Sequence, residues 1–452
     1  MRALSRALLR RGQRGQILIL TGLSLIVLIG AVGLAVDAGR AYGVKARLNA
    51  AVDAASIAAA RALAQGADEG ARIANAQATA VRFFNLNYPT DFLSSTPSAP
   101  TTSAVREETG RWRVRVSATA EMPTTFMRVL GRTELNVAAM GEAVRRDLDV
   151  ILVMDTSGSI GSDFGTLQQA AKNSFVNKFN SGVGGDRFGL VSFASGAVVD
   201  VPIDKTANRG FDRPTVVNAI NALTSIGPTA SAEAMRKALD ELNAVPAANR
   251  SSLRVILLFS DGAPNLINGT FLRSTGSTVS GNLDSVYLFG PETKPGEVWA
   301  ADQRFGPFAD YPDINRLPNQ GSGNIPLASF NNRRGFTGAS YAQPYPYENN
   351  DCNSNKAARN MLENIANSAR GQDIRVYSIG LGANLNALEV TICGYDMANE
   401  KGSTIMKRLA NTADSDTLNT GQPQGLYCHA ASSSELDRCF STIASEILRL
   451  TL

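Results

Sequence analysis

The sequence contains a single histidine among 452 residues, and none of its four cysteines forms a Cys-x-x-Cys pair. Histidine and paired cysteines supply most zinc ligands, so zinc sites are disfavoured. A Ser-His-Asp hydrolase is disfavoured for the same lack of histidine. A GxxxxGK[ST] loop for nucleotide phosphates is also absent. These absences point away from catalysis.

Acidic residues are absent from the first 14 positions, which hold five arginines. The whole chain has a formal net charge of +4, so the part that follows these arginines carries −1. A protein that binds nucleic acid needs a basic face on its folded body. We therefore expect no nucleic-acid partner.

Residues 17–36 carry no charge and are rich in Ile, Leu, Val and Gly. Twenty helical residues span about 30 Å, the thickness of the hydrocarbon core of a bilayer. The positive flank at 1–16 is expected to stay in the cytoplasm and the rest to be exported. The alternative is a cleaved signal peptide with its site at Gly33-Leu34-Ala35. The apolar run is longer than such peptides need, which favours an uncleaved anchor.

Two segments are expected between the anchor and the main body of the chain. Residues 37–87 are alanine-rich and predict a helix that continues out of the membrane, either as a stalk or as a surface that docks on a similar helix. Residues 88–146 predict a small β-rich domain. It begins with a Pro-, Ser- and Thr-rich linker or loop at 88–104, and alternation of apolar and polar residues indicates a strand at 111–118.

The body, residues 147–452, alternates predicted strands with predicted helices. This order is typical of an α/β fold with a doubly wound parallel sheet. The expected central strands are apolar runs at 147–154, 187–193, 253–259 and 374–379.

Two of these strands end in loops that carry acidic residues. One loop reads Asp155-Thr156-Ser157-Gly158-Ser159 and the other Ser260-Asp261-Gly262, while Thr229 stands in a third loop before a predicted helix. Ligands of doubly wound sheets bind beyond the carboxyl ends of the strands. Carboxylate and hydroxyl oxygens suit a hard cation, so we predict a site for Mg²⁺, with Mn²⁺ or Ca²⁺ as substitutes.

A long insertion, residues 262–350, follows the second acidic loop. It is rich in Gly, Asn and Pro but holds 12 of the 30 aromatic residues, so we expect an ordered excursion near the metal site. It either shapes the surface that a partner would contact or is a decorative loop.

The four cysteines lie late in the chain, at Cys352, Cys393, Cys428 and Cys439. An even number on the exported side of an anchor predicts two disulfides, with three possible connectivities. A thiol enzyme built on Cys428-His429 is disfavoured because no other element supports it.

The N-terminal stretch contains Gly15, the apolar run, Val36-Asp37, Gly39-Arg40 and the Asp53-Ala54-Ala55 block. In these features it resembles the TadG-type proteins of the tight-adherence (Flp) pilus system. The resemblance implies a role in pilus assembly and a pilin-like plan for the first 146 residues. Pseudopilins of that system carry Glu five residues after a processing glycine, whereas Leu20 stands there in this chain, so such cleavage is not expected.

From residue 147 onward the chain resembles the von Willebrand factor A domain with its metal-ion-dependent adhesion site. The residues that match this site are Asp155, Ser157, Ser159, Thr229 and Asp261. The family more often has Thr before the last Asp, where this chain has Ser260. The resemblance implies that an acidic residue of a partner protein completes the coordination of the metal. The alternative is a vestigial site that only stabilises loops.

Together these features predict a bacterial inner-membrane protein that spans the bilayer once, with its C-terminal domain periplasmic or extracellular. The expected function is metal-dependent binding of a protein during assembly or anchoring of a tight-adherence pilus, without catalysis. One alternative is a surface adhesin for a host or matrix ligand. Another is a subunit of a chelatase-like machine, which the exported topology disfavours because such machines need a partner ATPase in the same compartment.

Overall fold

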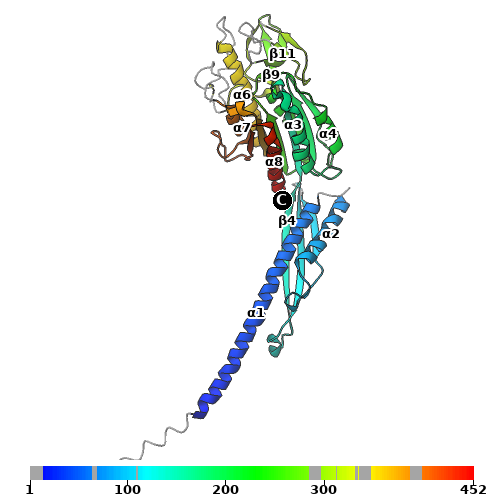
Figure 1. Ribbon diagram of the computed structural model, residues 1–452, viewed down its shortest axis with the longest axis vertical. Coiled ribbons are helices and arrows are strands. Elements are labelled where there is room, and N and C mark those ends of the chain that lie inside the picture. Colours follow the sequence, from blue (N-terminus) through cyan, green and yellow to red (C-terminus); the bar gives the residue numbers. More distant parts are fainter. Residues whose placement is uncertain are drawn as a thin grey trace, which may run out of the picture. The chain divides into compact units, whose positions relative to one another are not determined.

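A computed structural model describes residues 14–63, 69–107, 110–284, 297–311, 313–330, 334, 348–386 and 400–451, with the side chains of 14–16, 315–316 and 348–353 left out. The chain forms two compact units (Figure 1). The first unit holds residues up to 63 together with 70–106 and 112–145. The second holds residues 146–452 and the short stretches 64–69 and 107–111.

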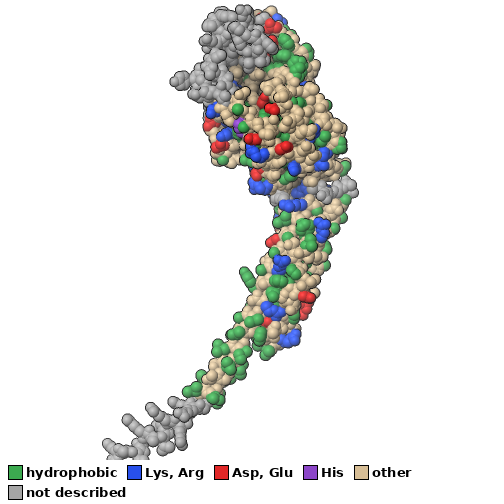
Figure 2. All heavy atoms as spheres, viewed as in Figure 1, with side chains coloured by type: hydrophobic (Ala, Val, Ile, Leu, Met, Phe, Trp, Pro, Cys, Tyr) green, Lys and Arg blue, Asp and Glu red, His purple; other side chains and the backbone are tan. Residues whose placement is uncertain are grey.

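The first unit is built on α1 (Arg14–Ala62), the one helix in the described part that is long and apolar enough to cross a membrane. Its apolar residues from Ile17 to Val32 are exposed, and Figure 2 shows hydrophobic side chains along it. The helix ends in a turn at Leu63, and α2 (Glu69–Asn87) follows. The alanine-rich segment therefore forms two helices, where the sequence suggested one.

Both helices of the first unit pack on a four-stranded sheet in which β3 is the central strand and pairs with the other three. The strands are β1 (Thr96–Pro97), β2 (Thr101–Glu107), β3 (Arg111–Pro123) and β4 (Glu134–Arg146). The expected linker at 88–104 thus contains strand residues, because the edge of β3 offers them a hydrogen-bonding partner.

Alternate residues of β3, from Trp112 to Met122, point into the core of this unit. Opposite them lie Val44 and Leu48 of α1, while small residues such as Ala51 and Ala55 let the helix approach closely. The alternation predicted for 111–118 is therefore present in the structure.

The second unit contains a six-stranded sheet in the order β15-β14-β8-β5-β6-β7, parallel except for β7 at one edge. Strand β15, at the other edge, is only four residues long and pairs with β14. The strands are β5 (Leu148–Asp155), β6 (Arg187–Phe193), β7 (Ala197–Val201), β8 (Leu253–Ser260), β14 (Ile374–Leu381) and β15 (Tyr427–Ala430).

Helices cover both faces of this sheet, so the doubly wound α/β fold is confirmed. Val150 and Leu152 of β5 face one core, whereas Ile151 and Val153 face the other. The first core is covered by α3 (Phe164–Ala170), α4 (Arg213–Asn221) and α8 (Leu436–Leu450). The second is covered by α5 (Ser231–Ala244), α6 (Glu348–Gly371) and α7 (Gly402–Ala410).

The insertion contains a second sheet, antiparallel, in the order β12-β11-β10-β9-β13. Ile267, Phe271 and Leu283 of this sheet are buried in the same core as α5 and α6. The described part of the insertion is therefore ordered and packed on the domain. Its strands are β9 (Leu266–Arg273), β10 (Thr278–Asp284), β11 (Glu297–Trp299), β12 (Phe308–Asp310) and β13 (Ile314–Arg316).

A disulfide joins Cys428 on β15 to Cys439 on α8, with 5.5 Å between the two Cα atoms. The expectation of a disulfide is confirmed for this pair, and the bond removes the thiol that an enzyme at Cys428-His429 would need. The side chain of Cys352 and the whole of Cys393 lie outside the described residues.

A buried cluster of charges ties the insertion to α6 and α7. Arg334 of the insertion lies 2.6 Å from Glu363 of α6 and 2.7 Å from Glu400, which also pairs with Arg359 and Arg408. Burial alone would raise the pKa of Glu400, but the three guanidinium groups outweigh it and hold that pKa at about 2. The carboxylate is therefore charged throughout the neutral range.

Replacing this carboxylate should make the second unit less stable and less sensitive to acid. In Glu400→Gln the guanidinium groups lose a buried partner, so we expect a loss of about 3 kcal/mol in the free energy of unfolding at pH 7. A depressed carboxyl pKa stabilises the fold above the unfolded value of about 4.3, and this stabilisation is lost as the pH falls toward the folded value. Denaturant unfolding in detergent between pH 7 and pH 2.5 measures both effects.

The matched control is Glu435→Gln, because Glu435 forms an exposed ion pair with Arg438. Exposed ion pairs contribute little to stability, so this variant should stay close to the wild type at every pH. Equal losses in the two variants, or parallel pH curves for Glu400→Gln and the wild type, would contradict a stabilising role for the buried cluster.

Candidate metal-binding site

The pairing of β5 with β8 brings the two acidic loops together. These strands are parallel neighbours, and Met154 of β5 lies opposite Phe259 of β8. The next residue of each strand, Asp155 and Ser260, is therefore at the same edge of the sheet, and Asp261 follows at once. The chain turns sharply after Asp155 into a short 3₁₀ helix that begins at Gly158.

Four of the five predicted ligands are joined by hydrogen bonds. The Ser159 hydroxyl donates to Asp261 Oδ1 at 3.0 Å, and the Ser157 hydroxyl lies 3.1 Å from the Ser159 hydroxyl and 3.5 Å from the same carboxylate oxygen. The backbone N–H of Ser157 donates to Asp155 Oδ1 at 2.7 Å. The structure thus brings Asp155, Ser157, Ser159 and Asp261 into one cluster.

The fifth predicted ligand, Thr229, lies in the loop before α5, which is bonded to both acidic loops. On one side, the Ser225 hydroxyl donates to the Ser157 carbonyl at 2.6 Å, and Gly158 N–H donates to the Gly227 carbonyl at 2.9 Å. On the other side, Thr229 N–H donates to the Asn265 side chain at 2.7 Å. Thr229 is therefore positioned beside the cluster.

Ser260 has a role that sequence reasoning missed. Its hydroxyl donates to Asp155 Oδ2 at 2.5 Å, so the two oxygens of Asp155 are held by Ser260 and by the backbone of Ser157. One signal was visible in the sequence, since a hydroxyl residue, Ser260, directly precedes the second acid. The bond fixes the orientation of a carboxylate that is completely buried.

The electrostatics of this cluster favour a cation. Burial, reinforced by the nearby charge of Asp261, raises the pKa of Asp155 to about 7. Burial also raises the pKa of Asp261, although hydroxyls of Ser159 and Ser157 donate to it. Neither carboxylate forms an ion pair within the described part of the chain. A bound cation would relieve the repulsion between them.

The available donors fit a hard divalent cation. They are two carboxylates and three hydroxyls, all oxygen, as Mg²⁺, Mn²⁺ and Ca²⁺ prefer. Among the described residues, no group of three or more His, Cys, Asp or Glu side chains offers an alternative metal site. Ser159 is exposed and Asp261 partly exposed, so the cluster opens to solvent.

The insertion reaches the loops that surround this cluster. The Phe305 ring lies so close to Gly227 that a Cβ at that glycine would be 2.8 Å from the ring. Phe305 also packs on Trp299, and the tilted rings of Trp299 and Phe308 have their centroids 4.5 Å apart. Phe305 and Phe308 are each about half exposed. An aromatic surface, Phe305 and Phe308, therefore adjoins the Thr229 loop.

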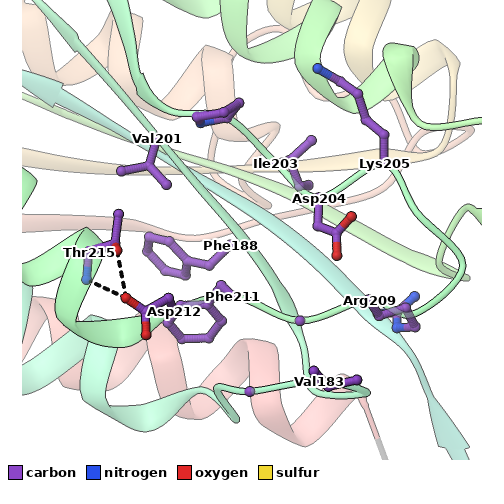
Figure 3. Close-up of a pocket in the computed structure, with 13 residues that line it drawn as sticks. Val183, Phe188, Val201, Ile203, Asp204, Lys205, Arg209, Phe211, Asp212 and Thr215 are labelled. Atoms are coloured by element: carbon purple, nitrogen blue, oxygen red, sulfur yellow. Dashed lines mark hydrogen bonds between the residues drawn. The ribbon is translucent and has the colours of Figure 1, made fainter. Parts of the chain in front are cut away.

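The pocket in Figure 3 lies elsewhere, around the amino end of β6. It contains Phe188, which directly follows the first residue of that strand, whereas the acidic cluster is at the carboxyl ends. Its polar groups already have structural partners. Asp212 caps α4 by accepting from Thr215, and Arg209 donates to the Leu148 carbonyl and the Ser251 hydroxyl. We assign no function to this pocket.

Two sequence families match the chain. Residues 150–263 match the von Willebrand factor type A domain, and residues 15–76 match the putative Flp pilus-assembly TadE/G-like family. The first match includes all five candidate ligands, and the second includes the apolar part of α1. No curated protein matches the chain.

Similar solved structures include the pilus adhesin SpaC from Lactobacillus rhamnosus GG, with 15% identity and a TM-score of 0.38 over 78% of this chain and 34% of SpaC. This chain thus spans about a third of SpaC. The vWF domain of the type V pili tip protein Mfa5 from Porphyromonas gingivalis has 18% identity and a TM-score of 0.38 over 69% of this chain and 98% of that domain.

A third similar structure is proximal thread matrix protein 1 from the mussel byssus, with a zinc-occupied MIDAS motif. It has 14% identity and a TM-score of 0.33 over 67% of this chain and 46% of that one. At these low scores, neither partner nor metal follows for this chain. The two family matches lead to one conclusion: the protein joins a segment that matches the TadE/G-like family to a domain that matches the von Willebrand factor type A family.

Proposed function

We propose that this protein binds a protein partner through a divalent cation, and that it does so in the assembly or anchoring of a tight-adherence (Flp) pilus. The observation that carries the proposal is the cluster of oxygen donors where β5 and β8 end, open to solvent at Ser159. The TadE/G-like match of residues 15–76 supports the pilus context.

The proposed ligands of the cation are Asp155, Ser157, Ser159, Thr229 and Asp261, with Mg²⁺ as the expected ion. When bound, the cation would supply positive charge at the open edge of the site and attract an acidic side chain of the partner. Asp155 is oriented by Ser260, and the hydroxyls of Ser157 and Ser159 lie beside Asp261. We propose binding without catalysis, since the cluster offers oxygen ligands and contains neither a histidine nor a cysteine.

We further propose that α1 anchors the chain in the bacterial inner membrane as a single span. Its residues 17–32 are apolar and exposed, which is unfavourable in water and favourable in lipid. The five upstream arginines favour a cytoplasmic N-terminus, so the A domain would be periplasmic or extracellular. The disulfide between Cys428 and Cys439 agrees with an oxidising compartment.

The metal site can be tested by titrating the purified protein with Mg²⁺ in a calorimeter. We expect Asp155→Ala to remove measurable binding, because it deletes a buried carboxylate ligand. Ser260→Ala keeps all five proposed ligands but removes one of the two hydrogen bonds that orient Asp155, so we expect roughly 10- to 100-fold weaker binding, as for other residues that orient metal ligands. The control Asp240→Ala removes an exposed carboxylate on α5 and should bind Mg²⁺ as the wild type does. Unchanged binding in Asp155→Ala would refute the site.

The pilus role can be tested by cross-linking in cells that produce tight-adherence pili. Purification of the wild-type chain should enrich a pilus or pilus-assembly protein, and the same protein should be missing with Asp155→Ala or after treatment with EDTA. Mass spectrometry identifies the partner. Recovery of the same proteins from wild type and Asp155→Ala would refute metal-dependent binding, and recovery without any pilus component would refute the pilus role.

The aromatic surface beside the site predicts a separation of partner binding from metal binding. Because Phe305 is half exposed and touches Gly227, we expect Phe305→Ala to weaken partner binding about tenfold, as for an aromatic interface residue. It should leave the affinity for Mg²⁺ unchanged. Phe330→Ala, another exposed phenylalanine of the insertion, is the control. Equal partner binding in both variants would show that the insertion takes no part in recognition.

A further inference from the structure

The turn between β3 and β4 presents exposed apolar side chains. It contains the short 3₁₀ helix Met127–Leu130 and ends at Gly131, whose φ of 80° lies in the left-handed region. Phe126 is 43% exposed, Val129 88% and Leu130 68%. We refer to residues 126–131 as the tip. Exposing three large apolar side chains on one short turn to water is unfavourable, which indicates that another surface covers them.

The tip is fixed against α1 at the end of its apolar run. Phe126 packs on Gly33 so closely that a Cβ at this glycine would lie 2.6 Å from the Phe126 Cβ. Among the residues of α1 whose burial is described, which start at Ile17, Gly33 is the first that is buried. Three helical residues rise about 4.5 Å, so this contact lies about 5 Å before the end of the apolar run at Val36.

Asp37 holds the tip in this position. Its carboxylate is completely buried and accepts backbone N–H groups of Thr125, Phe126 and Met127 at 3.0, 2.8 and 2.7 Å. Arg40, one turn further along α1, donates to the Thr125 hydroxyl at 2.8 Å. Burial acts to raise the pKa of Asp37, but the three N–H donors and Arg40 prevail and lower it. The carboxylate is therefore ionised at neutral pH.

Polar and aromatic groups near the tip match the level of lipid headgroups. Arg128 and Arg132 are exposed on either side of Val129 and Leu130. Tyr42, on α1 just beyond the Asp37 contact, is 78% exposed. Arginine and tyrosine are the residues that membrane proteins place at the interface, with their charged or hydroxyl ends toward the headgroups.

We propose that the tip is a second membrane contact, in which Phe126, Val129 and Leu130 enter the outer part of the same leaflet that α1 leaves. This inference rests on the membrane anchor proposed above. Lipid is the proposed occupant because the tip touches α1 within its apolar run, so that any bilayer surrounding residues 17–36 must also surround the tip. Two contacts with one leaflet would fix the rotation of α1 and keep the first unit at the membrane surface.

The experiment uses the full chain in vesicles of phosphatidylcholine and phosphatidylglycerol, with or without brominated acyl chains, which quench tryptophan in contact with them. Val129→Trp reports on the tip, and emission of the wild type, with its Trp112 and Trp299, is subtracted. Leu25→Trp reports on the apolar run of α1. Met140→Trp is the matched control, because Met140 is an exposed apolar residue of β4 whose neighbour Gly141 faces Val52. Val52 lies about 28 Å further along α1 than Gly33.

We expect quenching in Val129→Trp and Leu25→Trp and none in Met140→Trp. Quenching in Leu25→Trp without quenching in Val129→Trp would overturn the membrane contact of the tip and leave the anchor intact. A tip covered by protein, including a second copy of this chain, would give this same result. Absence of quenching in Leu25→Trp would overturn the anchor and the tip contact together. Equal quenching in Val129→Trp and Met140→Trp would also overturn the proposal, since it would show no depth preference.

Discussion

The parallel register of β5 and β8 is the constraint on which the candidate site depends. Because Met154 lies opposite Phe259, the chain must place Asp155 and Asp261 at the same edge, one completely buried and the other partly exposed. Two carboxylates so close in a medium of low dielectric repel each other, and burial penalises each. Hydroxyls and backbone N–H groups surround them, but these dipoles supply no net positive charge. The candidate site therefore offers oxygen donors but lacks compensating positive charge, and a divalent cation would supply that charge.

The end of β8 also determines which part of the chain surrounds the site. After β8 the chain leaves the main sheet and builds a second one, and the segment from Trp299 to Phe308 returns to the loops near the acidic cluster. There Gly196 lies against Ala300 and Ala301, and Gly227 lies against Phe305. The buried cluster around Glu400 fixes another part of the insertion on α6 and α7. The proposed metal ligands and the neighbouring aromatic surface are therefore built by different parts of the chain, and this is why they should respond separately to substitution.

The sequence predicts the central sheet and the acidic loops because strands buried on both faces, such as β5, are continuous apolar runs. Such runs can be recognised without knowing which strands they pair with. It predicts poorly where structure depends on distant pairing. Strands β1 and β15 are short and form against β3 and β14. The composition of the insertion predicts an ordered excursion but no particular strands, yet the insertion pairs with itself into a sheet. Ser260 was visible in the sequence, but its bond to Asp155 exists only because two strands in register bring them together.

Helix α1 lies in two different environments along its length. Up to Val32 every described side chain is exposed, and from Gly33 onward a helical stripe through Asp37, Val44 and Leu48 is buried against the rest of the first unit. The change occurs within a single turn, and the bonds from Asp37 to the tip lie in that turn. No free length of chain separates the apolar run from the folded unit. If residues 17–36 span the bilayer, α1 itself holds the first unit at the membrane surface, without a flexible tether. Moving the unit away would require breaking α1 or separating the buried Asp37 carboxylate from three backbone N–H donors.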